Sequence, residues 1–128
     1  MTKRAAIYAR VSTTDQKDNG WGLEKQEDAC RRYADAHDFE VVVVFREDIS
    51  GMTPFTERPE GARLQKLLDS RGADAVLFQC VDRLARDDLL GRIMARRWLE
   101  NGTEIHFTSI GKIERDNDIK FLIDGWAG

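Results

Sequence analysis

The sequence has little of the chemistry that holds small proteins together without an apolar core. Its 128 residues include only two cysteines, Cys30 and Cys80. This number excludes a disulfide framework and a structural zinc site, so we expect two buried free thiols in a reducing compartment. A chain of this length can instead bury one apolar core, and we expect a single domain around it.

Long apolar segments are also absent. No uninterrupted apolar run exceeds that of residues 41–45, whereas a helix that spans a bilayer needs about 20 apolar residues. The first residues lead directly into a short strand-like segment, without the apolar core of a signal peptide. We therefore expect no membrane partner and a cytoplasmic protein.

An excess of basic charge is missing as well. The 20 basic residues stand against 23 acidic ones, a formal net charge of −3, and this balance alone does not indicate a nucleic-acid partner. The basic residues are nevertheless mostly arginine, 14 against 6 lysines. Arginine suits planar, bidentate contacts with phosphate, although a GC-rich genome would produce the same bias.

Two periods of apolar residues alternate along the chain. Short apolar runs predict strands, and stripes at helical spacing predict helices between them. The expected strands cover residues 5–11, 40–46, 75–81 and 104–108, and the expected helices begin at Leu23, run from Pro59 to Gly72, and cover residues 87–100. This order predicts an α/β fold with a mainly parallel central sheet of about four to five strands and helices on both faces.

Two of these segments carry a more specific expectation. The four consecutive valines in residues 40–46 put apolar side chains on both faces of the strand, which is typical of a central parallel strand. The helix at residues 87–100 has a broad apolar stripe, which we expect to face the core. The members of this stripe are Leu89, Leu90, Ile93, Met94, Trp98 and Leu99.

Polar loops at residues 13–22 and 48–59 follow the first two expected strands. In an open parallel sheet, functional side chains gather beyond the carboxyl ends of the strands. Ser12 lies at the first such end, and Arg10 precedes it by two residues on the same side of the strand. Further charged residues follow the other strand ends, namely Arg58, Asp82, Arg83 and Arg86. A hydroxyl among guanidinium groups fits a phosphodiester, whose oxygens gain charge as a nucleophile adds.

No residue stands out as a general base for Ser12. His37 and His106 are the only histidines, and each fits a core or surface position better than a catalytic one. A Ser-His-Asp hydrolase is therefore disfavoured.

Three separated motifs resemble, in order and spacing, the catalytic domain of serine recombinases of the resolvase/invertase family. They are residues 8–13 (YARVST) with Gln16 and residues 23–26 (LEKQ), residues 48–51 (DISG) with Arg58 and Pro59, and residues 82–87 (DRLARD). The match runs from about residue 4 to the end of the sequence. The extra residues 17–22 and the Arg58–Pro59 pair look more like large serine recombinases and transposon integrases than small resolvases.

The resemblance implies a site-specific DNA recombinase. Ser12 would attack the DNA phosphodiester and form a 5′-phosphoseryl intermediate, after which strands are exchanged and rejoined. Arg10, Arg83 and Arg86 would bind and neutralise the phosphate. Arg58 would join them when its loop closes.

The same resemblance gives roles to four more residues. Gln26 would orient the nucleophile or the phosphate, and Asp82 would hold an arginine in place or assist protonation. Gln16 and Ser50 would contact the substrate. No metal and no nucleotide cofactor are implied, because the covalent link conserves the phosphodiester energy. The implied partners are DNA and further copies of the chain, as a dimer to tetramer in the active full-length parent.

The resemblance also divides the chain. Residues 1–116 would be the catalytic domain, and residues 117–128 the start of a long dimerisation helix, truncated and without a DNA-binding domain. Alone, such a chain is expected to bind DNA weakly, while its cleavage activity and oligomeric state stay open. The target site, the directing partner and the choice between integration, excision and inversion stay open too.

Two other functions remain open on the residues alone. Asp116 and Asp118 form a D-x-D motif and Glu47 ends the second expected strand, and such carboxylates hold Mg²⁺ in Toprim-like nucleases and topoisomerases. That hypothesis leaves the arginines without a role. A non-enzymatic flavodoxin-like binding module would need an acidic cluster after the first strand, where this chain has Arg10 and Ser12.

Overall fold

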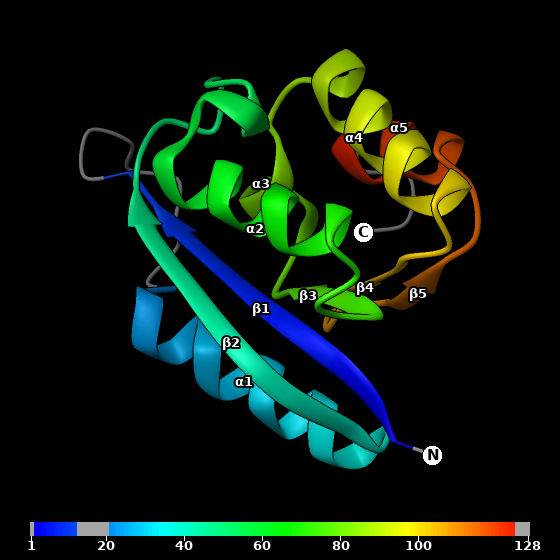
Figure 1. Ribbon diagram of the computed structural model, residues 1–128. Helices are drawn as coiled ribbons and strands as arrows, with labels where there is room; N and C mark the ends of the chain where they lie inside the picture. Colours follow the sequence, from blue (N-terminus) through cyan, green and yellow to red (C-terminus); the bar gives the residue numbers. More distant parts are fainter. Residues whose placement is uncertain (1, 13–20, 125–128) are drawn as a thin grey trace.

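Five strands form one sheet in the part of the chain that this computed structural model describes, residues 2–12 and 21–124 (Figure 1). They are β1 (Lys3–Val11), β2 (Phe39–Asp48), β3 (Ala75–Phe78), β4 (Glu104–Phe107) and β5 (Gly111–Ile113), in the order β2-β1-β3-β4-β5. The first four strands are parallel, and β5 pairs with β4 in the antiparallel sense. The expected mainly parallel sheet is confirmed.

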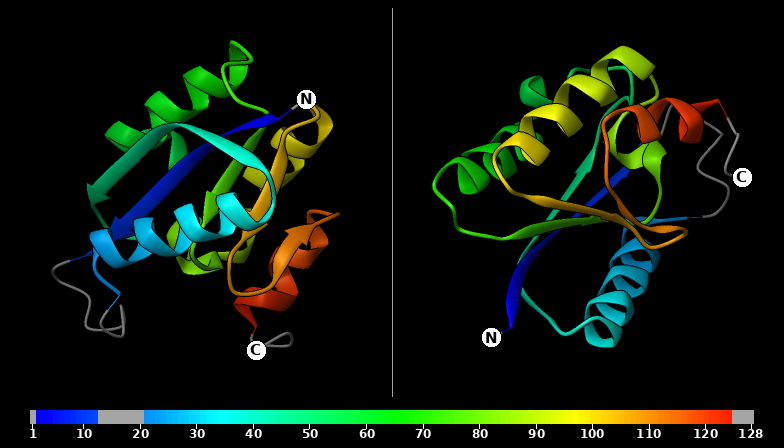
Figure 2. Two further views of the ribbon diagram at one scale, coloured as in Figure 1. Left: turned by 90° about the horizontal axis from the view of Figure 1, so that it is seen from below. Right: turned by 90° about the vertical axis from the view of Figure 1, so that its right-hand side faces the viewer.

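Helices cover both faces of this sheet, as expected (Figure 2). Of the described helices, only α1 (Leu23–Ala36) packs against one face. On the other side lie the 3-10 turn η2 (Phe55–Glu57), α2 (Pro59–Asp69), α3 (Val81–Leu84), α4 (Asp88–Glu100) and α5 (Asn117–Ile123). No helix in the described ranges is long and apolar enough to cross a membrane.

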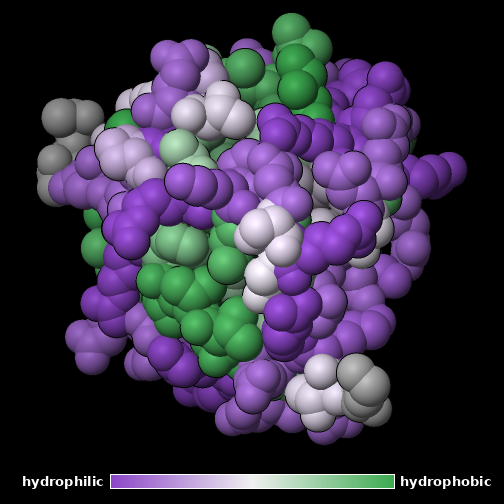
Figure 3. Space-filling model, viewed as in Figure 1, coloured by the Kyte–Doolittle hydropathy of each residue, from purple (hydrophilic) through white to green (hydrophobic). Residues whose placement is uncertain are grey.

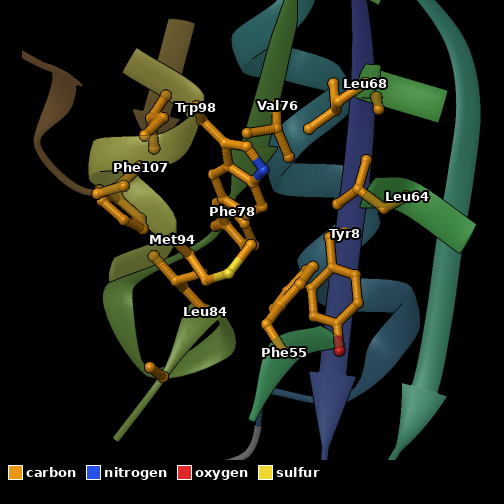
Figure 4. Packing of buried hydrophobic residues seen from close by; sticks show 14 of the residues in the cluster. Tyr8, Phe55, Leu64, Leu68, Val76, Phe78, Leu84, Met94, Trp98 and Phe107 are labelled. Carbon is orange, nitrogen blue, oxygen red and sulfur yellow. The ribbon is translucent and has the colours of Figure 1, made fainter. Parts of the chain in front are cut away.

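The larger of two apolar cores lies between the sheet and α2 and α4 (Figure 4). Aromatic side chains from four elements meet there: the ring centroids of Tyr8 and Phe55 are 4.9 Å apart, and those of Phe55 and Trp98 are 5.3 Å apart. The indole nitrogen of Trp98 donates to the side chain of Gln65 (2.7 Å), so this buried polar group is satisfied. Phe78 from β3 completes the cluster.

The smaller core lies under α1, where Cys30 and Ala34 pack against Ile7 and Leu77. Cys30 is a buried free thiol, as expected, and burial raises its pKa to about 12. Cys80, at the end of β3, is only half-buried. The expectation of two buried thiols is therefore correct for one of them.

The placement of the valine-rich strand in the middle of the sheet is wrong. β2 is an edge strand, and the strand beside it, β1, is an interior one, with residues 5–9 fully inaccessible. The pairing with β1 shifts between Ala5 and Ala6, whose partners are Val41 and Val43, and Val42 between them is 41% exposed. β-branched residues favour a strand but do not specify its position in the sheet.

The edge position of β2 leaves an apolar hollow between this strand and α2 (Figure 3). Its volume is about 410 Å³, and its apolar lining comes from Val43, Phe45 and Leu67. Arg63 and Lys66 of α2 also line it. Val43 therefore packs at the margin of the core and stays partly open to solvent through this hollow.

The apolar stripe expected on residues 87–100, which form α4, is only partly correct. Met94 and Trp98 are buried, but Leu89 is 64% and Ile93 is 54% exposed. The buried face of α4 instead includes Gly91, where an added Cβ would lie 2.8 Å from Ile119 of α5. The close approach of α5 turns the buried stripe toward Gly91, and the two large residues beside it face outward.

Candidate active site

The carboxyl end of β1 brings Ser12 and Arg10 to one edge of the sheet. Both are buried, Ser12 at 5% and Arg10 at 0% exposure. The amide of Ile49 donates to the carbonyl of Val11 (2.8 Å), so the loop after β2 begins directly beside Ser12. The neighbouring strand β3 ends at the same edge and leads into α3, which carries Asp82 and Arg83. The structure therefore gathers these residues where the strand pattern predicts.

The guanidinium of Arg10 joins the loop after β2 to α3. It donates from one terminal nitrogen to the carbonyl of Ile49 (2.9 Å) and from the other to the carbonyl of Asp82 (2.7 Å). Its Nε is buried and has no hydrogen-bond partner among the described residues. A buried donor without a partner is unusual and costs free energy, so it marks a position that an acceptor from outside the chain would stabilise.

Other guanidinium groups crowd Arg10. Burial lowers the pKa of Arg10, and repulsion from three neighbouring cations lowers it further; they are Arg58, Arg86 and Arg83 in order of effect. Such a concentration of like charge is stabilised by an anion, and phosphate matches the fork geometry of arginine.

Neutral acceptors bind all three nitrogens of the Arg83 guanidinium. Its Nε and one terminal nitrogen lie 3.4 Å from the side-chain oxygen of Gln79, and the other terminal nitrogen lies 3.4 Å from the carbonyl of Arg10. Arg86 is half-buried, and its amide donates to the carbonyl of Gly51 (3.2 Å). Gln79 was not expected at this site, because only the fold shows that its side chain turns back toward Arg83 of α3.

Gln26 is fully buried and binds main chain on both sides. Its side-chain oxygen accepts from the amide of Arg10 (3.0 Å), and its side-chain nitrogen donates to the carbonyls of Arg10 (2.9 Å) and Trp21 (2.8 Å). The pairs between β1 and β3 end at Ile7 and Leu77. Beyond that point the side-chain amide of Gln26 binds the main chain of Arg10, as a neighbouring strand would. It thereby fixes the main chain two residues before Ser12.

The remaining expected site residues are spread more widely. The group of Asp82 that Arg10 contacts is the main-chain carbonyl. Ser50 is exposed, and its hydroxyl accepts from the amide of Met52 (3.1 Å), which stabilises a turn. Gln16 lies outside the described residues.

Arg58 is fully buried below this cluster. Its guanidinium donates to the carbonyls of Thr53 (3.0 Å), Arg83 (2.9 Å) and Gly51 (3.3 Å). In this arrangement the side chain faces main-chain oxygens of the protein and not the surface. Tyr8 and Gly51, which also border Arg58, lie inside the sequence motifs but were not singled out.

Both histidines have partners away from Ser12. His37 is exposed at the end of α1. His106 is buried between the hydroxyl of Tyr33 (2.6 Å) and a carboxylate oxygen of Glu104 (2.9 Å). Glu104 also pairs with Lys3 at the start of β1, so this network lies at the opposite end of the strand from Ser12.

The carboxylates of the magnesium hypothesis stabilise the fold elsewhere. Glu47 binds the hydroxyl of Tyr8 and accepts from the first amides of α2. Asp116 pairs with Arg92 (3.7 Å) and Arg96 (3.4 Å), and Asp118 accepts from two main-chain amides before α5. Within residues 2–12 and 21–124, no three potential ligands cluster in a metal-binding arrangement.

The family described as "Resolvase, N terminal domain" matches residues 5–125. The chain belongs to the resolvase family. This resolvase-family domain is the catalytic domain of a site-specific DNA recombinase, as the resemblance implied. The nuclease and binding-module alternatives are not favoured.

Solved structures agree with this membership. The N-terminal catalytic domain of TP901-1 integrase is 26% identical with a TM-score of 0.77, over 98% of this chain and 94% of that one. The C-terminal catalytic domain of ISC1926 TnpA, an IS607-like serine recombinase, is 35% identical with a TM-score of 0.69, over 82% and 68%. A resolvase family site-specific recombinase from Streptococcus pneumoniae, 19% identical with a TM-score of 0.73 over 98% and 86%, shares the fold. A comparison with curated protein sequences finds no match.

Proposed function

We propose that Ser12 is the nucleophile of this recombinase and that the surrounding arginines are its phosphate site. One observation carries the proposal: the buried hydroxyl lies two residues beyond Arg10, whose guanidinium is repelled by three other arginines. A phosphodiester at this position would pair its non-bridging oxygens with the cations. The buried Nε of Arg10, which has no partner among the described residues, would then find an acceptor.

In the reaction, the Ser12 oxygen loses its proton and forms a bond to phosphorus, and the bond from phosphorus to the DNA 3′ oxygen breaks. The 3′ oxygen takes up a proton, so the products are a 5′-phosphoseryl link and a free 3′ hydroxyl. The number of phosphoester bonds is unchanged, and resealing is the reverse reaction with the 3′ hydroxyl of an exchanged strand. No nucleotide cofactor enters this balance.

Arg10, Arg83 and Arg86 stabilise the charge that builds on the phosphorus-bound oxygens. They also favour the deprotonated serine, which compensates for the lack of a histidine base. Loss of one such preorganised donor typically lowers the rate by about 100- to 1,000-fold. Gln26 fixes the main chain of Arg10, and Asp82 places its carbonyl on the same guanidinium.

We further propose that the substrate is DNA and that strand exchange requires several copies of the chain, as a dimer to tetramer. Residues 1–116 would form the catalytic domain, and α5 would begin a dimerisation helix. The exposure of Leu89, Ile93 and Phe121 supports a contact between copies along α4 and α5. The free thiols support a reducing compartment such as the cytoplasm.

Covalent capture tests the proposal. The chain, extended through a dimerisation helix and fused to a DNA-binding module of known site, is incubated in EDTA with DNA nicked beside the expected cleavage position. A denaturing gel and peptide mass spectrometry then look for DNA attached to Ser12. We expect an adduct in the original sequence and in Ser109→Ala, a second serine at the same edge of the sheet, and none in Ser12→Ala. Cleavage that appears only with Mg²⁺, or an adduct at another residue, would refute the proposal.

A further inference from the structure

Gln79 is a buried polar side chain beside the active site, at the point where β3 ends. It is 8% exposed and lies between Phe78, the last residue of β3, and Cys80, which precedes α3. Its side-chain oxygen accepts from two nitrogens of the Arg83 guanidinium, at 3.4 Å each. Burying an amide is costly unless it is hydrogen-bonded, so a glutamine that faces a cation of the active site needs an explanation.

The main chain of Gln79 is fixed to the neighbouring strand. The regular pairs between β3 and β4 end at Phe78 and Phe107, and hydrogen bonds continue beyond them. The carbonyl of Gln79 accepts from the hydroxyl of Thr108 (3.2 Å) and from the amide of Ser109 (3.3 Å). The side chain of Gln79 therefore starts from a fixed position at the active-site edge of the sheet.

The two contacts with Gln79 orient the guanidinium of Arg83. Nε and one terminal nitrogen form one edge of this planar group, and a single oxygen that faces both of them sets the direction of that edge. The distances exceed the usual range of about 2.7–3.2 Å for such bonds, so the amide directs the guanidinium more than it binds it. The other terminal nitrogen lies 3.4 Å from the carbonyl of Arg10, two residues before Ser12. Arg83 thus bridges the ends of β3 and β1.

The acceptor is neutral, and this affects the charge of the site. Burial lowers the pKa of Arg10, and repulsion from neighbouring cations that include Arg83 lowers it further. The charge of Arg83 is therefore felt where the phosphate is proposed to bind. A carboxylate in place of the Gln79 amide would hold the same edge by a bidentate ion pair and would offset much of that charge. A glutamine directs the guanidinium without this loss.

We propose that Gln79 is a positioning residue for Arg83: its side-chain oxygen directs the guanidinium toward the Ser12 end of β1, and its neutrality leaves the positive charge for the phosphate. This inference rests on the proposed function, in which Arg83 binds the phosphate, and it adds a residue to which that function gives no role. Gln79 acts through Arg83 and is not itself expected to touch the DNA.

Exchange of the Arg83 Nε proton with water tests the contact in the 128-residue chain, without DNA. Nuclear magnetic resonance of the isotope-labelled chain reports this proton, and its absence in Arg83→Lys assigns the signal. Gln79→Met removes the acceptor at a similar side-chain length. We expect about tenfold faster exchange in this variant, as the loss of a hydrogen bond to a charged group predicts. Gln79→Glu keeps an acceptor, and its exchange is expected to be no faster than in the original sequence.

A second buried glutamine provides the matched control. Gln65 is 6% exposed and accepts from the indole nitrogen of Trp98 (2.7 Å) in the larger core. Gln65→Met therefore also removes a buried amide, and we expect it to leave the exchange of the Arg83 proton unchanged. If Gln79→Met does not fold, Gln79→Ala replaces it. Unchanged exchange in the Gln79 variant that lacks the acceptor, or equally fast exchange in Gln65→Met, overturns the proposal.

Covalent capture with the fusion described above tests the effect on the reaction. We expect Gln79→Met to lower the rate of Ser12 adduct formation about tenfold, less than the loss of a phosphate donor itself, because the guanidinium is no longer held in one direction. Gln79→Glu is expected to be slower as well, although its Arg83 proton stays protected, because the carboxylate offsets the charge. Gln65→Met is expected to match the original sequence.

A double variant shows whether Gln79 acts through Arg83. Arg83→Lys keeps a cation but has no planar edge for the amide to direct. Adding Gln79→Met to it is therefore expected to change the rate by less than about twofold. An equal loss of rate in both backgrounds, or a Gln79→Glu variant as fast as the original sequence, overturns the proposal. If the original sequence forms no Ser12 adduct, the proposed function fails, and proton exchange still decides whether Gln79 holds Arg83.

Discussion

Replacement of Gln26 by alanine distinguishes a residue that fixes the main chain from one that contacts DNA. The side chain is fully buried and makes three hydrogen bonds, two to Arg10 and one to Trp21. In Gln26→Ala the amide of Arg10 loses its partner inside the protein, because β3 ends before it. Leaving one buried main-chain donor unsatisfied costs about 1–3 kcal/mol.

The lost bonds to the two carbonyls and the small cavity add to this cost, although the carbonyl of Arg10 keeps its contact with Arg83 (3.4 Å). We therefore expect a decrease of about 2–4 kcal/mol in the free energy of unfolding. Urea denaturation measures it, with Glu24→Ala on the exposed face of α1 as the control, expected within about 0.5 kcal/mol of the original sequence. A Gln26→Ala protein that is as stable as this control, yet forms no Ser12 adduct, would refute the reasoning and place Gln26 on the DNA.

Three further predictions concern burial. Cys80 is expected to react with a thiol reagent well before Cys30 in the folded protein at pH 8, since burial raises the pKa of Cys30 to about 12; peptide mapping measures the order. Leu89→Ala and Ile93→Ala are expected to change the unfolding free energy by less than about 1 kcal/mol, and Met94→Ala to lower it by about 2–4 kcal/mol, as buried apolar side chains do. Burial lowers the pKa of His106 below 6.5, so as the pH falls the imidazole is protonated in the unfolded chain before it is protonated in the folded one. The stability that His106 contributes is therefore lost as the pH falls below about 6.5. Urea denaturation at pH 7.5 and 5.5 is expected to show a smaller loss in His106→Gln than in the original sequence.

Each of these three has an outcome that contradicts it. Equal reactivity of the two thiols would mean that α1 opens readily. A cost at Leu89 as large as that at Met94 would mean that the exposed side of α4 is covered in solution. An equal loss of stability on acidification in both proteins would assign the pH dependence to carboxylates and not to His106.

The sequence predicts the sheet because its local signals agree with its packing. Residues 5–9 form an apolar run that suits a buried strand, and Pro59 suits the first turn of a helix, where α2 begins. The position of Ser12 at a strand end follows from these elements. The prediction of an active site at this edge therefore needs only local patterns and the rule for parallel sheets.

The parts that could not be predicted depend on contacts between distant segments. Val42 is in a strand of valines, yet its exposure follows from the order of strands, which local propensity does not contain. The sequence places Arg58 in a loop near the substrate. It does not show that the four acceptors of its guanidinium come from three different segments. From the sequence, Gln26 is likewise only a polar residue of a helix. Its side-chain amide binds the main chain of Arg10 because β3 ends before that point.

The shift in pairing at Val42 bears on how the protein stays dispersed. No strand among the described residues pairs with the outer side of β2, which is ten residues long. Such an edge can add a strand from another molecule and start aggregation. The irregularity falls near the middle of β2 and divides the edge, so the regular part available to an incoming strand is only residues 43–48. Arg46 and Asp48, both exposed, place charges along that shorter part. Deletion of Val42, which would restore even pairing with β1, would lengthen the open edge and favour self-association of the domain.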